Sequence, residues 1–229
     1  MQWDISAPPF GDRAVLDNFQ KHSYPLGIVV NLAGERFLDE GADYRNYTYA
    51  KYGRAVMQQP RRTAVQIFDR KTIGLLRDEY RIRQVTRAEA NTIEELARQL
   101  DIDLDGLSRT VDRFNIACRP GSFDPSVLDG KRTEGIVPPK SNWALPIDTP
   151  PFTGFVVTCG ITFTFGGLRI DETGAVLDEA DRAIPGLYAA GELVGGLFYQ
   201  NYLGGAGLMA GSVFGRIAGA GAGRHTRTG

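Results

Sequence analysis

The chain has 229 residues, of which 42% are hydrophobic and 23% are charged, and its formal net charge at pH 7 is −1. This length allows one large domain or two modest ones. The near-zero charge excludes the basic footprint of a nucleic-acid-binding protein. The apolar run 204–223 consists mostly of Gly and Ala and is broken by Ser and Arg, so it predicts no membrane span.

Metal and redox chemistry based on side chains is not expected. Cys118 and Cys159 lie far apart and lack metal-ligand spacing, and the chain has two histidines in all. Met1 leads into polar residues rather than into a basic and then apolar stretch, so no signal peptide is predicted. A reducing, cytoplasmic setting fits these features best.

The first 118 residues predict short strands and amphipathic helices. Residues 2–17 show no clear period, whereas apolar runs predict strands at 26–31 and 64–68 and a helix follows at 70–80. Thr92 and Glu95 form a capping box that starts another helix. The next helix ends at Pro120-Gly121 and carries one apolar stripe, which we expect to be core: Leu107, Val111, Phe114 and Ala117.

The character of the chain changes after a long connection. Residues 119–151 are rich in Pro, Gly and Asp, which is typical of a binding loop or a linker. Strands are then predicted at 155–157 and 168–170, with a turn at 171–174. A buried strand at 184–188, a glycine-rich loop and a helix of small residues at 208–218 follow. We place a boundary near residue 160, between an α+β unit and a sheet-plus-helix unit.

The glycine-rich loop formally matches a dinucleotide fingerprint. Gly205, Gly207 and Ala210 have the Gly-x-Gly-x-x-Gly/Ala spacing, but no Val/Ile strand runs into them and no acidic residue follows at the required distance. The match is therefore a false positive for that motif. Two interpretations stay open: a loop that lets a flat ligand approach a helix N-terminus, or a helix packed tightly on a sheet.

Three blocks of sequence carry a family resemblance. The C-terminal block, 184–192 with its continuation 195–219, resembles the last block of FAD-dependent fumarate reductase and succinate dehydrogenase flavoproteins. Residues 34–45 (GERFLDEGADYR) resemble the substrate-cap motif of that family, and residues 160–167 resemble its return into the flavin domain. Within the family the chain looks most similar to tricarballylate dehydrogenase, some relatives of which carry the name precorrin-3B synthase.

The resemblance implies a fold and a cofactor. It implies an α+β fold in which residues 1–160 are a substrate-capping domain with its preceding connection. Residues 161–229 are then the C-terminal segment of a Rossmann-like FAD-binding domain whose N-terminal part lies upstream. We therefore expect FAD in the full-length protein and no tightly bound FAD in residues 1–229 alone. The incomplete sheet would leave apolar strand edges that favour self-association.

The resemblance also implies which residues meet the flavin. Glu192 would bind a ribityl or ribose hydroxyl. The backbone around Gly204, Gly205, Gly207 and Leu208 would meet the pyrimidine edge of the isoalloxazine. A helix N-terminus there stabilises the negative charge of a reduced flavin.

The resemblance implies that Arg45 is catalytic. It would either move the proton in a relay through Glu40 or act as an electrostatic clamp. The alternative is a surface salt bridge of Arg45 with Glu40 or Asp43. Thr162 and Tyr202 stand where fumarate reductases have a histidine and an arginine that bind carboxylates. A plain succinate or fumarate site is therefore in doubt, and Tyr202 is similar to a tyrosine of ketosteroid dehydrogenases.

Other side chains could complete a substrate site. His22 could bind an anion in place of the missing groups, or could be an ordinary packed residue. The hydroxyl of Tyr47, in a cluster with Tyr44, Tyr49 and Tyr52, could bind a carboxylate, or the cluster could join a cap to its partner.

Three function classes follow: a flavoenzyme that desaturates a carboxylic acid, a flavin oxidoreductase acting on a cyclic ketone or tetrapyrrole precursor, and a cap module without cofactor. The resemblance further suggests an iron–sulfur membrane partner that reoxidises the flavin.

Overall fold

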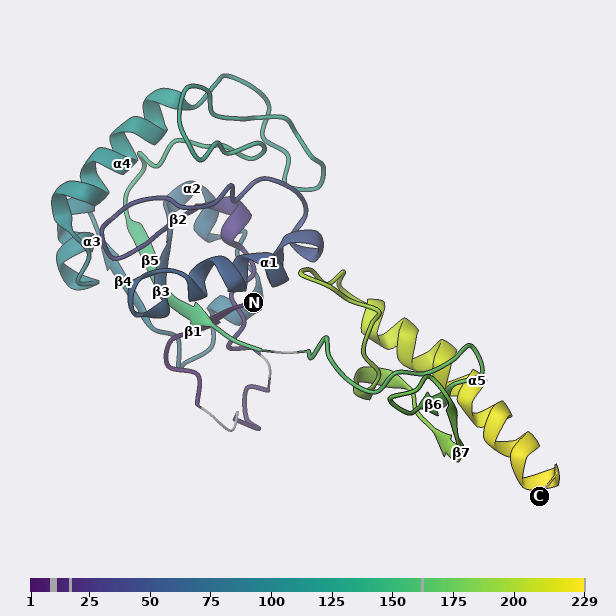
Figure 1. Cartoon of the computed structure of the whole chain (residues 1–229). Helices are drawn as coiled ribbons and strands as arrows, with labels where there is room; N and C mark the ends of the chain where they lie inside the picture. Colours follow the sequence, from purple (N-terminus) through teal and green to yellow (C-terminus); the bar gives the residue numbers. More distant parts are fainter. Residues whose placement is uncertain (9–11, 17, 162, 229) are drawn as a thin grey trace. The chain divides into compact units, whose positions relative to one another are not determined.

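A computed structural model describes residues 1–8, 12–16, 18–161 and 163–228. The chain divides into two compact units, Met1–Gly160 and Ile161–Gly229, which are described separately (Figure 1). Both helices and strands occur in each unit, as the α+β expectation requires. None of the helices in the described residues is both long enough and apolar enough to span a bilayer.

The larger unit is built on an antiparallel sheet. Its strands run in the order β1-β5-β3-β2, and β4 also pairs with β5. β1 pairs with residues 157–159 of β5 and β4 pairs with residues 152–155, so the two short strands share one edge of β5 while β3 occupies the other. The strands are β1 (Gln2–Asp4), β2 (Ile28–Val30), β3 (Thr63–Phe68), β4 (Arg87–Ala90) and β5 (Phe152–Cys159).

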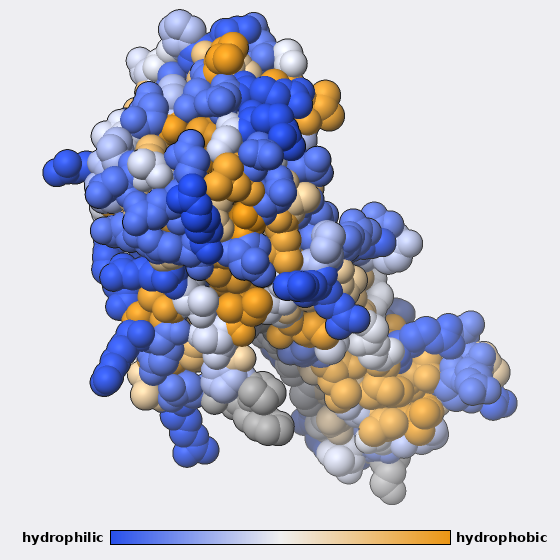
Figure 2. All heavy atoms as spheres, turned by 90° about the vertical axis from the view of Figure 1, so that its left-hand side faces the viewer, coloured by the Kyte–Doolittle hydropathy of each residue, from blue (hydrophilic) through white to orange (hydrophobic). Residues whose placement is uncertain are grey.

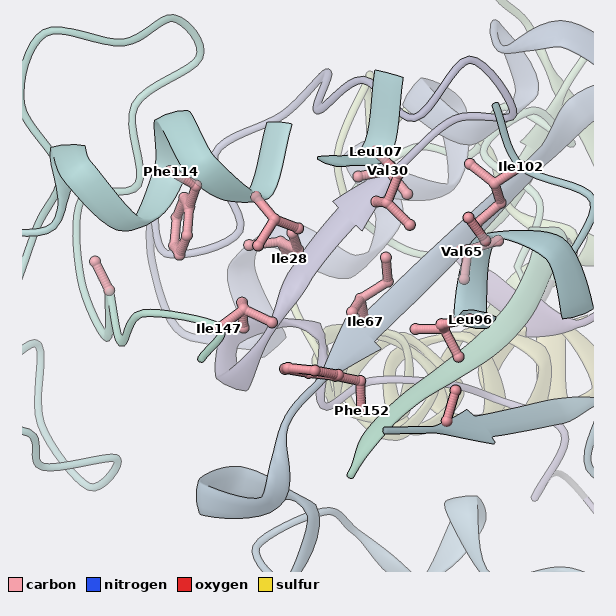
Figure 3. Packing of buried hydrophobic residues seen from close by; sticks show 14 residues of the cluster. Ile28, Val30, Val65, Ile67, Leu96, Ile102, Leu107, Phe114, Ile147 and Phe152 are labelled. Atoms are coloured by element: carbon pink, nitrogen blue, oxygen red, sulfur yellow. The ribbon is translucent and has the colours of Figure 1, made fainter. Parts of the chain in front are cut away.

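Helices cover this sheet on both faces. They are α1 (Arg45–Met57), the single turn α2 (Arg70–Ile73), α3 (Ile93–Gln99) and α4 (Leu104–Ala117). Ile28 and Val30 pack in one core cluster with side chains of α3 and α4, as Figure 3 shows. Val29, between them, packs in a second cluster with Tyr52 and Val56 of α1. Successive residues of a strand point to opposite faces, so β2 alone shows that the unit has a helix–sheet–helix arrangement.

Most of the elements predicted in this unit are confirmed. β2 lies inside the predicted strand 26–31, β3 begins one residue before the predicted strand 64–68, and residues 155–157 are part of the longer β5. The Thr92 side chain accepts the Glu95 amide at 3.1 Å and caps α3, as the capping box predicts. The apolar stripe of α4 is buried, although this helix ends at Ala117. Between residues 119 and 151 the structure has no helix or strand.

Other predictions in this unit are wrong or incomplete. The helix predicted at 70–80 ends at Ile73, and a 3-10 helix forms separately at Asp78–Tyr80. β1 and β4 were not predicted. β1 has three residues, too few to show a period, and β4 has the sequence RAEA, in which charges alternate with alanine.

The smaller unit contains a two-stranded antiparallel sheet, β6 (Ala175–Leu177) and β7 (Ala183–Tyr188), and the helix α5 (Ala206–Thr228). The predicted turn at 171–174 is confirmed, since the Asp171 carboxylate accepts the Thr173 and Ala175 amides. Residues 168–170 form two isolated bridges instead of the predicted strand. The small core consists of Val176, Ala189 and Val194.

The predicted burial of β7 is wrong. Ile184 is 38% exposed and Leu187 is 44% exposed, although β6 pairs with β7 and α5 approaches it at Gly186 and Tyr188. Figure 2 shows apolar side chains gathered on the visible face of this unit. Further large apolar side chains of the unit are also exposed: Leu193, Leu197, Tyr199, Leu203, Leu208, Met209 and Val213.

Candidate functional site

The larger unit holds a pocket that brings two predicted site residues together. It has a volume of about 300 Å³ and is lined by His22 and Arg45, together with Arg77, which was not predicted. The other lining residues are uncharged: Ser23, Pro25, Leu26, Tyr44, Asn46, Leu75, Pro125 and Trp143. Among the described residues that line the pocket, the two charged ones are therefore arginines. The walls of the pocket are largely apolar.

Arg45 is the first residue of α1 and is half-buried. No acidic residue lies in the first turn of this helix, and Tyr44 provides no side-chain cap. Burial, together with the nearby Arg77 guanidinium, lowers the pKa of Arg45 below its usual range. An arginine nevertheless stays charged at any working pH, since its ordinary pKa exceeds about 12. A cation at a helix N-terminus is unfavourable by itself, and a bound anion relieves that cost.

His22 is the side-chain partner of Arg45. The Nη1 atom of Arg45 lies 3.5 Å from Nδ1 of His22. The imidazole is 4% exposed, and burial, followed by the charge of Arg45, lowers the pKa of His22 to about 3. The ring is therefore neutral at physiological pH. Because an arginine can only donate, Nδ1 accepts and the ring proton lies on Nε2, which is buried and has no hydrogen-bond partner among the described residues.

Arg77 is held by a carboxylate that also contacts His22. Its Nε donates to both carboxylate oxygens of Glu79, at 3.1 and 2.9 Å. The Glu79 Oε1 atom also accepts the backbone amide of His22 at 3.3 Å. His22 thus contacts Arg45 through its side chain and Glu79 through its backbone, so one short network positions both guanidinium groups.

Glu40 is engaged elsewhere. Its carboxylate is fully buried, pairs with Arg36 at 2.6 Å and accepts the Val29 amide at 2.7 Å. Arg36 is four residues before Glu40, and a buried charge needs such a partner. Neither Glu40 nor Asp43 forms an ion pair with Arg45 among the described residues, so the salt bridge weighed as the alternative is not found. A relay from Arg45 would require a partner other than Glu40.

The remaining predicted substrate residues lie apart from the pocket or outside the described chain. Tyr47 is 48% exposed on α1 and does not line the pocket, whereas Tyr44 does. Tyr49 and Tyr52 are buried, and the Tyr52 hydroxyl donates to the Asp39 carbonyl. The Tyr52 ring packs with side chains of the sheet, whereas the Tyr49 ring contacts His22, with the ring centroids 5.3 Å apart. Thr162 lies outside the described residues.

In the smaller unit, Glu192 lies in a 3-10 helix, Gly191–Leu193. Its carboxylate accepts the Thr164 amide at 2.7 Å and lies 3.2 Å from the Thr164 hydroxyl. The group is exposed, so a hydroxyl-bearing ligand could still reach it. The predicted role of Glu192 toward a ribityl chain or ribose stays a prediction.

The predicted isoalloxazine loop precedes α5. Gly205 has φ +90°, which favours glycine, and the helix begins at Ala206. The Gly207 amide donates to the Tyr202 hydroxyl at 2.9 Å, and a Cβ on Gly207 would stand 2.5 Å from that oxygen and 2.6 Å from the Phe163 ring. Tyr202 therefore points toward the loop.

A flavin edge would fit this helix end on one condition. The Ala206 amide donates to the Leu203 carbonyl, and the Met209 amide to the Gly205 carbonyl. A ligand carbonyl would compete with Tyr202 for the Gly207 amide, so the hydroxyl would have to turn aside. Leu208, also predicted here, is 79% exposed, and its side chain leaves the site open. The absence of a side chain at Gly207 and the aromatic rings nearby suit a flat ligand.

No cluster of three metal-ligating side chains occurs within the described ranges.

Comparison with known proteins agrees with the sequence motifs. The family model described as "FAD binding domain" matches residues 6–208. The chain belongs to the FAD-dependent fumarate reductase and succinate dehydrogenase flavoprotein family. It is 32% identical over 201 residues to a probable fumarate reductase, Ifc3, of Shewanella frigidimarina. The aligned region covers 86% of this chain and 31% of that protein. The chain thus spans about a third or less of the curated relatives Ifc3 and the NADH:acrylate oxidoreductase of Vibrio harveyi.

Solved structures of flavoproteins resemble the fold. The open conformation of a flavocytochrome c3 fumarate reductase matches with a TM-score of 0.64 and 27% identity, over 98% of this chain and 36% of that one. The 3-ketosteroid Δ1-dehydrogenase from Sterolibacterium denitrificans matches with a TM-score of 0.68 and 28% identity, over 97% of this chain and 43% of that one. These matches support a flavoprotein fold, and the family binds FAD.

Proposed function

We propose that this chain is the substrate-capping portion and the C-terminal flavin-contacting portion of an FAD-dependent dehydrogenase that desaturates a tricarballylate-like carboxylic acid. In this proposal, residues 1–160 form the cap and residues 161–229 belong to the FAD-binding domain. The observation that carries it is the pocket of the larger unit, in which the charged lining residues are arginines and Arg45 comes from the family's cap motif. The family match supplies the cofactor.

Arg45 would hold the substrate carboxylate next to the carbon that loses a proton. When bound, FAD supplies a two-electron acceptor for hydride, and the substrate must also lose one proton to a base. Arginine is a poor resting base, so Arg45 acts as an electrostatic clamp or passes the proton to an acceptor in concert. His22 is neutral and therefore adds no positive charge to the site. Its Nδ1 atom accepts from Arg45 and fixes the orientation of that guanidinium.

Residues of the smaller unit would bind the flavin. The amides around Gly205 and Gly207 favour negative charge at the start of α5, and Glu192 would accept from a sugar or ribityl hydroxyl. Gly204, the predicted contact before them, precedes the helix in the same loop. The exposed apolar side chains of this unit suit burial against further protein of the flavin domain.

A cyclic ketone is the second candidate substrate. The Gly207 amide donates to the Tyr202 hydroxyl at 2.9 Å, and if that hydroxyl turned aside, its proton and the amide could together polarise a carbonyl. The likeness to the 3-ketosteroid dehydrogenase structure supports this candidate.

A turnover screen of the full-length flavoprotein separates the two. We expect reduction of the flavin by tricarballylate and not by a 3-ketosteroid, with an artificial acceptor standing in for an iron–sulfur partner. Preference for the steroid would contradict the acid substrate, whereas a purified full-length protein without flavin would indicate a cap that has lost its cofactor.

A further inference from the structure

Two guanidinium groups line one pocket although like charges repel. Arg45 and Arg77 both line the 300 Å³ pocket, and burial followed by the positive charge of Arg77 lowers the pKa of Arg45. Contacts with other protein groups position the two guanidinium groups. Those contacts are the His22 side chain for Arg45 and the Glu79 carboxylate for Arg77.

The contacts with protein leave most of the donors available. Within the described part of the chain, Arg77 uses Nε on Glu79, and Arg45 uses Nη1 on His22. The terminal nitrogens of Arg77 and the Nη2 atom of Arg45 have no recorded partner among those residues. A guanidinium carries five N–H donors in a fixed fork that matches a carboxylate. Each arginine can therefore receive a carboxylate of its own.

The number of guanidinium groups, rather than the net charge, fits a ligand with two carboxylates. Arg45, Arg77 and Glu79 together carry a net charge of +1 and His22 is neutral, but each arginine still has terminal donors that can bind a carboxylate. A monocarboxylate would leave one arginine without a ligand partner. The uncharged walls, among them Leu75, Pro125 and Trp143, suit the carbon skeleton between two carboxylates.

We propose that Arg77 is a specificity-determining residue that binds a second carboxylate of the substrate, so that the pocket selects polycarboxylates over monocarboxylates. This inference rests on the proposed function, since it assigns the ligand class of the same pocket. Arg77 would contact the end of the substrate remote from Arg45, and Glu79 would keep its guanidinium in place.

The test measures binding, which requires no flavin and no turnover. Isothermal titration calorimetry on the full chain of residues 1–229 uses three probes: tricarballylate, glutarate and butyrate. We expect tricarballylate and glutarate to bind more tightly than butyrate. Arg77→Gln should weaken binding of the first two by about 10- to 100-fold, the contribution of a charge-assisted bidentate pair, and should change butyrate binding by less than about 3-fold.

Two further variants isolate the effect. Arg81→Gln removes the same charge four residues away, from an exposed arginine that pairs with Asp78 and does not line the pocket, and should leave binding unchanged. Arg77→Gln combined with Glu79→Gln removes both charges of the ion pair, so that no unpaired carboxylate is left buried. The double variant should show the same selective loss if the pocket stays folded.

The outcomes separate the two proposals. Equal weakening of all three acids by Arg77→Gln, no weakening at all, or no binding of any acid by the wild-type chain would each overturn the role of Arg77. The turnover screen of the full-length flavoprotein decides the proposed function independently. An enzyme that oxidises tricarballylate while Arg77→Gln binds it normally would contradict this inference and leave the proposed function standing.

Discussion

The substitution His22→Gln removes a titratable group that the fold keeps neutral. Burial and the neighbouring positive charges lower the pKa of His22 to about 3, against an ordinary value of about 6.5. As the pH falls below about 6.5, the unfolded chain takes up a proton at this residue and the folded chain does not until about pH 3. The unfolded state binds more protons in this window, so the free energy of unfolding falls as the pH falls.

The size of the effect follows from the width of that window. A difference of one bound proton changes the free energy of unfolding by about 1.4 kcal/mol per pH unit. Between pH 6 and pH 4, His22 should therefore account for a loss of about 2 kcal/mol. Carboxylates also titrate in this range, so the informative quantity is the difference between the wild type and His22→Gln. Glutamine retains an oxygen that can accept from Arg45 but takes up no proton.

Urea unfolding followed by tryptophan fluorescence measures this difference. Trp3 and Trp143, the two tryptophans of the chain, both lie in the larger unit and report on it. In Arg45→Gln the pKa of His22 should rise, because the positive charge of Arg45, which lowers that pKa in addition to burial, is removed. The reasoning is refuted if wild type and His22→Gln lose the same stability between pH 6 and pH 4. It is also refuted if the His22 imidazole titrates near pH 6.5 in an NMR experiment on the folded chain.

Three further predictions concern single side chains. Arg45→Lys in the full-length enzyme should lower kcat by about 100-fold or more with flavin content unchanged, because lysine lacks the guanidinium fork. Tyr202→Phe removes the hydroxyl that accepts the Gly207 amide, so it should weaken substrate binding or turnover and cost the free chain about 1 kcal/mol or less in chemical denaturation. Lys140→Met should lower the free energy of unfolding by about 2–4 kcal/mol, since the buried Nζ donates to the Pro25 and Gly27 carbonyls, which would lose their partner.

Each of these predictions has a contrary result. Near-normal turnover of Arg45→Lys would exclude a role for the guanidinium in the reaction. Steady-state kinetics of Tyr202→Phe that match the wild type would remove Tyr202 from the substrate site. Unchanged stability of Lys140→Met would mean that the Pro25 and Gly27 carbonyls do not depend on Nζ of Lys140.

Local sequence signals predicted the elements that local interactions determine. The Thr92 capping box and the apolar runs of β2 and β3 need only neighbouring residues, and both predictions are confirmed. β1 and β4 exist because β5 offers them a pairing edge, and no local period announces them. The exposure of β7 depends on which protein surrounds the smaller unit, which its apolar sequence does not specify.

The candidate site was predictable to a similar extent. Arg45 and His22 were selected as chemical groups, and the fold brings them into one pocket. Arg77 gave no signal, because it lay inside a segment predicted as a helix, whereas α2 ends at Ile73 and Arg77 lines the pocket. Glu40 was weighed as a relay partner of Arg45, and in the structure its carboxylate pairs with Arg36, four residues before it. Partner choice among several nearby charges requires three-dimensional contacts.

The central claim is that the arginine pocket of the larger unit binds the acid that reduces the flavin. The most direct test is anaerobic mixing of the full-length flavoprotein with tricarballylate in a stopped-flow spectrophotometer, with wild type and Arg45→Lys compared at equal flavin content. The account predicts bleaching of the oxidised flavin in the wild type. In the variant, the bleaching rate should be lower by about 100-fold or more. Wild-type flavin that stays oxidised, or equal bleaching rates in the two proteins, would contradict it.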